Sequence, residues 1–370
     1  VTLIERDPQV LRPLDVEMAR IVEEHMRAKG VEIRLSADIS QVIREEDRAT
    51  AIEFKGGTRI PTDLIIVGAG VAPRIRLAQE SGLTIGPNGG VVVNQWMQTS
   101  DPMIYAVGDI VELRHGVTGQ AARIPLAGPA NRSGRIAGEH AASNSAAEMG
   151  SILGTAIVRV FELTAACTGL NEAALTAKGI PFRSAIVQAA SHATYFPGAE
   201  SMQLKVIYRP DNGKILGAQG VGGEGVDKRI DVIATAIHFG GTVHQLAQLD
   251  LAYAPPYGSA KDPIHMAAFV ACNDLHATPK LVSPQTTLVG MQVVDVRTER
   301  ERVQLPLHGA IPIEIDELPT RWHELNPALP TVVVCHSGKR AHVGACWLQG
   351  KGFQNVSNLS GGMSIRRLMA

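Results

Sequence analysis

Cysteine is scarce in this chain, which has four in 370 residues: Cys167, Cys272, Cys335 and Cys346. Their number and spacing fit neither a disulfide scaffold nor a structural zinc site. The histidines also lack the paired spacing of a metal site, so we expect no bound metal. A protein of this composition does not depend on an oxidising environment. We therefore expect a reducing compartment, and specifically the cytoplasm.

The chain also lacks an excess of charge, because 35 basic side chains oppose 36 acidic ones and leave a formal net charge of -1. No general electrostatic field would attract nucleic acid or an anionic membrane surface. No apolar stretch approaches the roughly 20 residues that a membrane span needs. We therefore expect neither a nucleic-acid partner nor a membrane partner. The length of 370 residues predicts more than one globular domain.

The first residues lack both an initiator methionine and a signal-peptide pattern. Val1–Glu5 instead has the pattern of a buried strand that ends in an acid, typical of the second strand of a dinucleotide-binding βαβ unit. The glycine-rich turn of such a unit precedes the acid by about 20 residues, so we expect that turn upstream of Val1. Glu5 would accept hydrogen bonds from the adenosine ribose, which favours NADH, whereas Arg6 leaves NADPH open.

The next segments predict the rest of an α/β unit. Asp15–Lys29 has the pattern of an amphipathic helix that ends at Gly30, and three short strands follow it. Leu64–Val67 then predicts a buried strand that runs into Gly68 and further glycines. Because glycine has no side chain, the backbone there could approach a ligand closely.

The most informative stretch is Thr99–Ala142. Its apolar run Ile104–Val107 predicts a strand that stops at Gly108 and places the carboxylate of Asp109 at a ligand. A second apolar segment then leads into a helix rich in small residues, whose free N–H groups could receive an anion or an electron-rich ring edge. The residues of that segment which we expect at the ligand are Pro125, Leu126 and Ala127.

This stretch resembles the second flavin motif of the pyridine nucleotide-disulfide oxidoreductases, T-S-x-P-x-I-Y-A-x-G-D, and the following LAGPANRSGR is similar to the coenzyme A-disulfide reductase and NADH oxidase branch. The resemblance implies that Asp109 contacts FAD. It also implies that the segment around Gly68, similar to the family's V-G-x-x-P, lies beside the nicotinamide of NAD(P)H. By itself Asp109 could equally be a turn residue that caps the next element.

A new α+β region begins after the polar break Ser145–Gly150, with a hairpin turn at Asp211–Gly213. Later, Leu251–Pro263 presents Tyr253 and Tyr257 on a stiff, proline-bearing loop. The region is similar to the family's dimerisation domain, which implies a homodimer. The match to Y-A-P-P-Y-x-S-A-K-D-P implies that the two tyrosines reach the substrate disulfide of the partner subunit. The alternative is a tyrosine pair that packs an interface loop.

The last region contains a thiol at the end of a predicted buried strand, Thr331–Val334 followed by Cys335. A glycine-bearing turn and a helix follow, so backbone N–H groups and the helix dipole would favour the thiolate. The positive charges of the loop would help to bind a persulfide or a thiosulfonate. The sulfur-binding loop that we predict consists of His336, Ser337, Gly338, Lys339 and Arg340.

This region resembles the rhodanese family in its D-V-R segment, its cysteine loop and its G-F-x-N-V-x-x-L-x-G-G segment, Gly352–Gly362. Cys335 and Arg340 have the spacing C-x4-R, whereas the related phosphatases use a longer C-x5-R loop, so sulfur is favoured over phosphate. The resemblance implies that Cys335 and Arg340 are catalytic. The segment ERERVQLPLHGAIPIEI departs from the family's usual G-H-I-P-G-A pattern on the substrate side.

The predicted fold class is α/β, with a partial flavoprotein of two dinucleotide-binding domains, an α+β dimerisation domain and an α/β rhodanese-like domain. The predicted boundaries are 1–88 for the NAD(P)H-binding part, 89–147 for the second FAD-binding segment, 148–275 for the dimerisation domain, 276–287 for a linker and 288–370 for the rhodanese-like domain.

The whole resemblance implies an FAD-dependent NAD(P)H oxidoreductase that acts on coenzyme A disulfide, coenzyme A persulfide or polysulfide and is coupled to a sulfur carrier at Cys335. The resemblance also places a redox cysteine and a first FAD turn upstream of Val1. Two alternatives remain open. In one, the rhodanese site alone is active as a sulfurtransferase; in the other, the chain is a non-catalytic dimeric relic.

Overall fold

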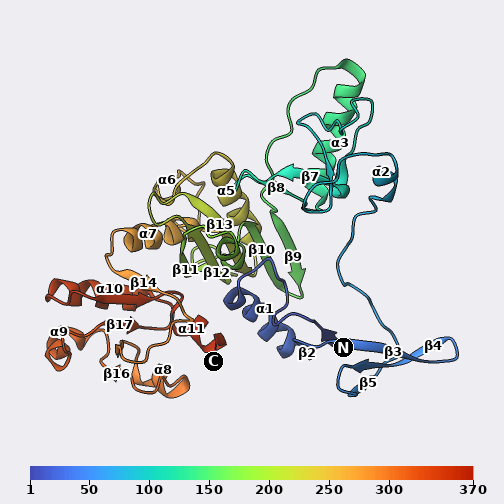
Figure 1. Ribbon diagram of the computed structural model, residues 1–370. Coiled ribbons are helices and arrows are strands. Elements are labelled where there is room, and N and C mark those ends of the chain that lie inside the picture. Colours follow the sequence, from blue (N-terminus) through green and yellow to red (C-terminus); the bar gives the residue numbers. More distant parts are fainter. Residues whose placement is uncertain (370) are drawn as a thin grey trace. The chain divides into compact units, whose positions relative to one another are not determined.

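The computed structural model describes residues 1–369 and divides into two compact units (Figure 1). The first unit contains Val1–Leu11 and Met26–Ala156. The second contains Arg12–His25 and the residues from Ile157 onward. Each unit has its own strands and its own buried residues, and each is described separately below.

The first unit opens with the predicted βα arrangement. Strand β1 (Thr2–Ile4) pairs in parallel with β2 (Glu32–Arg34). Helix α1 (Val16–Ala28) lies between them in the sequence, and most of it belongs to the second unit. A three-stranded antiparallel sheet follows. Its strands are β3 (Ile39–Glu45), β4 (Arg48–Phe54) and β5 (Arg59–Pro61). Of the three short strands predicted after the helix, the first is β2 and the other two are β3 and β4 of this sheet, whereas β5 was not predicted.

The second part of this unit surrounds a small core that includes Val91, Met97 and Val111. The long helix α3 contributes Ala137 to this core, so its small residues pack closely against the strands. The elements in chain order are α2 (Arg76–Glu80), β6 (Val91–Val92), the 3-10 turn η1 (Gly108–Ile110), β7 (Val111–Arg114), β8 (Ala121–Ala122) and α3 (Ala127–Ser143).

The prediction of a buried strand at Leu64–Val67 is wrong. This segment has no regular secondary structure, and Leu64, Ile66 and Val67 are 76%, 87% and 81% exposed. A strand is buried only when neighbouring strands and a covering layer accept it, and no strand in the described part of the chain pairs with this run. Apolar composition alone therefore did not determine the structure here.

The second unit begins with a five-stranded antiparallel sheet in the order β11-β12-β13-β10-β9. The predicted turn at Asp211–Gly213 connects β12 to β13, and Arg209 N donates to Lys214 O across it at 2.9 Å. The strands are β9 (Ala156–Val160), β10 (Leu163–Gly169), β11 (Arg183–Ala190), β12 (Ser201–Tyr208) and β13 (Ile215–Gly222). The helices are α4 (Glu172–Ala177), α5 (Val226–His238), α6 (Val243–Leu246) and α7 (Pro263–Leu275).

A parallel sheet follows, with strand order β14-β18-β17-β15 and β16 at the far edge. All four residues of the central strand β17 are buried, as the predicted run of valines requires. The strands are β14 (Lys280–Val282), β15 (Gln292–Asp295), β16 (Ile311–Pro312), β17 (Thr331–Val334) and β18 (Val356–Leu359). The helices are α8 (Glu299–Gln304), α9 (Leu318–Arg321), η2 (Trp322–Glu324), α10 (Lys339–Gly350), α11 (Gly362–Arg366) and η3 (Arg367–Met369).

The two sheets of this unit are joined by a buried polar junction at Asp274, near the end of α7. Its carboxylate accepts from the Arg183 guanidinium at 2.5 Å, from the Tyr208 hydroxyl at 2.7 Å and from the Leu281 N–H at 2.7 Å. Burial and the adjacent carboxylate raise the pKa of Tyr208. Leu281 belongs to β14, so the segment 276–287, which we predict as a linker, contains an edge strand of the last sheet.

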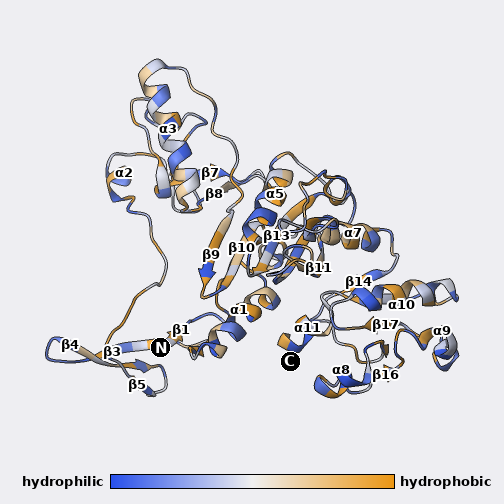
Figure 2. Ribbon diagram, turned by 180° about the vertical axis from the view of Figure 1, so that it is seen from behind, coloured by the Kyte–Doolittle hydropathy of each residue, from blue (hydrophilic) through white to orange (hydrophobic). Residues whose placement is uncertain are grey.

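Figure 2 shows how apolar residues are distributed along the ribbon. The edge strand β9 is largely apolar, yet Ile157 and Val158 are 59% and 40% exposed. Among the described residues, none of the helices combines the length and the hydropathy needed to cross a membrane.

Candidate functional site in the cysteine loop and the surrounding elements

Cys335 lies directly after the buried strand β17, as predicted, and is 1% exposed. The N–H of Gly338 donates to its Sγ at 3.1 Å. Gly338 has a φ of +88° and precedes α10, so the chain turns in a left-handed conformation before the helix begins. The thiol therefore accepts a backbone N–H immediately before a helix N-terminus, an arrangement that stabilises a thiolate or a persulfide anion.

The base of this loop is a second glycine turn that follows β18. Gly362 has a φ of +63°, and a Cβ there would lie 2.5 Å from His336 O and 2.6 Å from Cys335 O. Directly after it, Met363 N donates to Cys335 O and Ser364 N donates to His336 O, both at 2.9 Å. Only glycine fits this close approach, and the two bonds fix the carbonyls of the cysteine loop.

Arg340 is held by a carboxylate rather than by the loop. Its guanidinium forms a bidentate pair with Glu301 at 2.8 and 2.5 Å. Hydrogen bonds from Arg340 lower the pKa of Glu301 to about 2. Glu301 also completes the capping box of α8 with Thr298. The pair thus connects the beginning of α8 to the beginning of α10.

The remaining loop residues differ in exposure. His336 and Lys339 are exposed, whereas Ser337 is half-buried. On the inner side, the side-chain amide of Asn358 donates to Gly338 O at 3.1 Å. Of the predicted sulfur-binding residues, the structure therefore places the Gly338 N–H at the thiol, while the side chains of His336 and Lys339 are open to solvent.

The two tyrosines of the proline-bearing loop are exposed, Tyr253 by 48% and Tyr257 by 73%. Tyr253 shares a hydrogen bond of 3.0 Å between hydroxyls with Tyr195, and this bond raises the pKa of Tyr253. Behind the loop, Asp262 caps α7 and pairs with the buried Arg229 at 2.6 Å. The loop is therefore anchored at its end while its phenols remain accessible.

The predicted flavin residues lie in the Gly108–Asp109 turn, which contacts α3 at Ser133, and at the beginning of the same helix. Gly108, with a φ of +83°, donates its N–H to Ser133 Oγ at 3.2 Å, which ties the Gly108–Asp109 turn to the helix. Asp109 is exposed. At the helix N-terminus, Leu126 provides no side-chain cap, Ala127 is exposed and Pro125 is half-buried. An exposed carboxylate can accept from a polyhydroxyl chain, and N–H groups without a side-chain cap can donate to the polar edge of a flavin ring.

The predicted nicotinamide-dinucleotide residues are more dispersed. Glu5 follows β1 and is half-buried, and its Oε1 accepts from Asp7 N at 3.0 Å. Gly68 lies in the exposed irregular segment, where a Cβ would meet nothing within 4 Å. The space around Gly68 would admit the close approach of a ligand to the backbone.

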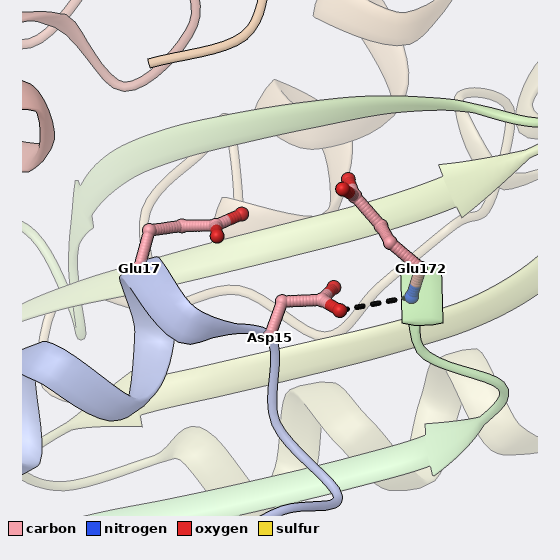
Figure 3. A group of neighbouring side chains, drawn as sticks. All are labelled: Asp15, Glu17 and Glu172. Carbon is pink, nitrogen blue, oxygen red and sulfur yellow. Dashed lines mark hydrogen bonds between the residues drawn. The ribbon is translucent and has the colours of Figure 1, made fainter. Parts of the chain in front are cut away.

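Three carboxylates converge elsewhere, in the second unit: Asp15, Glu17 and Glu172 (Figure 3). Such a group could hold a metal ion, but the buried ammonium of Lys205 contacts all three, at 2.7, 2.5 and 2.7 Å. Burial raises the pKa of Asp15, and the three carboxylates outweigh the same effect on Lys205, whose pKa is raised. Lys205 therefore takes the place that a cation would occupy.

The sequence did not reveal two partners of these sites, Glu301 and Tyr195. The pattern T-x-x-E at Thr298–Glu301 indicated a helix start, but nothing in it indicated the pair with Arg340. Tyr195 belongs to an aromatic, proline-bearing segment, Tyr195–Pro197, and such exposed aromatic residues could have been marked as a ligand surface.

Family profiles cover most of the chain. The profile described as pyridine nucleotide-disulphide oxidoreductase matches residues 1–134, and the dimerisation domain of the same family matches residues 155–263. A rhodanese-like domain profile matches residues 281–364. These matches follow the order of the resemblances noted in the sequence.

Individual proteins show the same relationship. A coenzyme A disulfide reductase of Staphylococcus aureus (strain JH9) is 34% identical over 270 residues, which are 73% of this chain and 60% of that protein. The structure described as reduced Bacillus anthracis CoADR-RHD has a TM-score of 0.94 and 41% identity, and the match covers 100% of this chain and 66% of that one. An NAD-dependent persulfide reductase from A. fulgidus has a TM-score of 0.91 and 38% identity, with coverages of 99% and 67%.

The chain spans about three fifths of the length of the curated relatives that it matches. Its mixed α/β architecture, with the dimerisation and rhodanese-like domains in sequence, agrees with the predicted fold class. The chain therefore belongs to the pyridine nucleotide-disulphide oxidoreductase family and carries a C-terminal rhodanese-like domain.

Proposed function

We propose that the chain contributes to an FAD-dependent NAD(P)H oxidoreductase whose substrate is coenzyme A disulfide, coenzyme A persulfide or polysulfide, and that Cys335 carries sulfur for it. The observation that supports this most is the match, over all three regions in order, to CoADR-RHD at a TM-score of 0.94. The persulfide reductase with the same architecture supports a sulfur substrate.

The sulfur step follows from the loop geometry. The Cys335 thiolate attacks the outer sulfur of thiosulfate, a sulfur–sulfur bond forms, and sulfite leaves with the electron pair of the broken bond. A nucleophile such as cyanide then takes the outer sulfur as thiocyanate and regenerates the thiolate. The Gly338 N–H, at 3.1 Å from Sγ, stabilises the anion, and the exposed charge of Lys339 attracts the anionic donor.

The cofactor residues have separate tasks. Asp109 would accept hydrogen bonds from the ribityl hydroxyls of FAD, and the N-terminus of α3, from Pro125 to Ala127, would face the polar edge of its ring. Glu5 would accept from the ribose of NADH, and Gly68 would lie beside the nicotinamide. The chemistry supplied by bound FAD is electron transfer between a reduced nicotinamide and a sulfur–sulfur bond.

We further propose a cytoplasmic homodimer in which Tyr253 and Tyr257 reach the substrate of the partner subunit. Their exposure, and the hydrogen bond between the hydroxyls of Tyr253 and Tyr195, support a role at a ligand. The dimerisation-domain match supports the dimer. The four free cysteines fit a reducing compartment.

A second candidate function is sulfur transfer by the rhodanese-like domain alone. The observation that favours it is that the cysteine, its N–H donor and its supporting turn all lie within one compact unit of this chain. The reductase, in contrast, needs FAD at the first unit and substrate at the tyrosines. A chain without either activity would be a dimeric scaffold.

The test is thiosulfate:cyanide sulfurtransferase activity of the chain, measured beside Cys335→Ser and beside Cys346→Ser as the matched control. Cys346 lies on α10 of the same domain, outside the loop. We expect Cys335→Ser to abolish thiocyanate formation and Cys346→Ser to retain it. Flavin absorbance and NADH-dependent reduction of coenzyme A disulfide are recorded on the same preparations.

The outcomes separate the two candidates. Bound flavin with disulfide reduction supports the reductase, whereas a colourless protein with Cys335-dependent sulfur transfer supports the sulfurtransferase alone. Equal sulfur transfer in wild type and Cys335→Ser would refute the role of Cys335. A chain that binds no flavin, reduces no coenzyme A disulfide and transfers no sulfur would support only the remaining alternative, a non-catalytic dimeric scaffold.

A further inference from the structure

The cysteine loop is supported by a residue that neither the loop nor the family motifs identify as functional, Ser360. It follows β18 and is 4% exposed. Its backbone N–H donates to Val282 O of β14 at 2.9 Å, which places it within the last sheet. Its hydroxyl accepts the N–H of Ile186 at 3.0 Å, and Ile186 belongs to β11 of the preceding sheet.

The next residue repeats this connection, because the Gly361 N–H donates to Ile186 O at 3.2 Å. Ile186 is on an edge strand, so its outward N–H and C=O need partners, and Ser360 and Gly361 provide both. Gly361 itself packs on the Ile186 side chain, since a Cβ there would lie 3.2 Å from Ile186 Cγ2. The turn after β18 is therefore fixed to β11 by two hydrogen bonds and by packing.

This same turn continues into the base of the cysteine loop. Directly after Gly361 come Gly362, whose absent side chain admits the Cys335 and His336 carbonyls, and the Met363 N–H that donates to Cys335 O. A displacement of the turn would therefore displace the carbonyl of Cys335. The N–H that donates to Sγ belongs to Gly338 of the same loop, so its direction would change as well.

We propose that Ser360 is a positioning residue for Cys335: it fixes the Gly361–Gly362 turn to β11 and thereby keeps the Gly338 N–H of the cysteine loop directed at the sulfur. This inference rests on the proposed sulfur-transfer role of Cys335. It makes β11, from outside the rhodanese-like domain, part of the support of the sulfur site.

The test compares the full chain with Ser360→Ala, Ser360→Thr and Ser357→Ala. Ser360→Thr retains a hydroxyl, and Ser357→Ala makes the same substitution three positions earlier, on β18. Two quantities are measured: kcat and KM for thiosulfate:cyanide transfer, and hydrogen exchange of the peptides that cover residues 361–364 and β17. The exchange measurement does not depend on any activity.

For Ser360→Ala we expect kcat to fall by about 10- to 100-fold, the loss typical when a reacting group is displaced by a remote change. KM for thiosulfate should remain within about twofold, because Lys339 and the loop charges remain. Exchange should accelerate at residues 361–364 but not in β17. Ser360→Thr should restore kcat to within about twofold of wild type, and Ser357→Ala should match wild type.

Several results would overturn the inference. These are unchanged kcat and unchanged exchange in Ser360→Ala, an equal loss in Ser357→Ala, no rescue by Ser360→Thr, or faster exchange throughout β17, which would indicate a general loss of stability. A wild-type chain without sulfur transfer would instead refute the proposed role of Cys335, and accelerated exchange at 361–364 alone would then still support the structural connection.

Discussion

Replacement of Lys205 by methionine should destabilise the second unit by about 3–5 kcal/mol near neutral pH, because removal of one partner leaves buried charges uncompensated. The Lys205 side chain is 0% exposed, and its ammonium lies 2.7 Å from Asp15 and 2.5 Å from Glu17, which are 6% and 2% exposed. Gln219 and Gln285 would still donate to these carboxylates but would not neutralise them. Methionine has nearly the same length, so little cavity cost is added.

The assay is urea unfolding followed by far-UV circular dichroism, with Lys280→Met as the matched control. Lys280 is an exposed residue of β14, so its replacement should change the unfolding free energy by less than about 0.5 kcal/mol. The loss in Lys205→Met should diminish on acidification, because the carboxylates can take up protons, and burial already raises the pKa of Asp15. A second change, Glu17→Gln, should recover part of the loss.

The reasoning would be refuted if Lys205→Met unfolded within about 1 kcal/mol of wild type near neutral pH with the same m-value. It would also be refuted if Glu17→Gln added to the loss instead of reducing it. Either result would mean that the three carboxylates do not depend on Lys205 for neutralisation.

Two further predictions concern single carboxylates. Burial raises the pKa of Asp15 above 3.8, so its protonated form favours the folded state. Wild type should therefore lose stability relative to Asp15→Asn as the pH rises through that raised pKa, and urea midpoints across this range measure it; a relative gain would contradict it. Hydrogen bonds from Arg340 lower the pKa of Glu301 from 4.5 to about 2, so its contribution is complete above the ordinary pKa and disappears as the pH falls through the lowered one. The difference in urea midpoint between wild type and Glu301→Gln should be constant above about pH 5 and decrease towards pH 2, and an increase on acidification would disprove this.

Local patterns predicted the parts of the molecule that depend on local physics. The run of valines before Cys335 forms the predicted buried strand and ends at the thiol. The strand predicted over Ile104–Val107 is wrong, because this segment forms only an isolated bridge between Gln98 and Tyr105 before the 3-10 turn that contains Asp109. The hairpin at Asp211–Gly213 followed from turn chemistry alone. The assigned roles of these side chains, like the predicted domain boundaries, stay predictions.

What could not be predicted depends on residues far apart in the sequence. Ser360 and Ile186 are 174 positions apart, and Lys205 meets Glu17 over 188 positions, so no local pattern contains either contact. At Leu64–Val67 a local pattern gave a wrong prediction, because an apolar run is buried only when other elements are available to cover it. The environment of these residues was determined by contacts, present or missing, with distant parts of the chain.

The strand β14 has a consequence for how sulfur can move within the second unit. The segment that connects α7 to the rhodanese-like domain is not a free tether, since it pairs with β18 and is fixed to Asp274 through Leu281. A domain joined in this way is not free to move as a unit between two binding sites. Under the roles proposed for Tyr253, Tyr257 and Cys335, sulfur that passes between the tyrosine loop and this thiol would then be carried by the small molecule and not by motion of the domain.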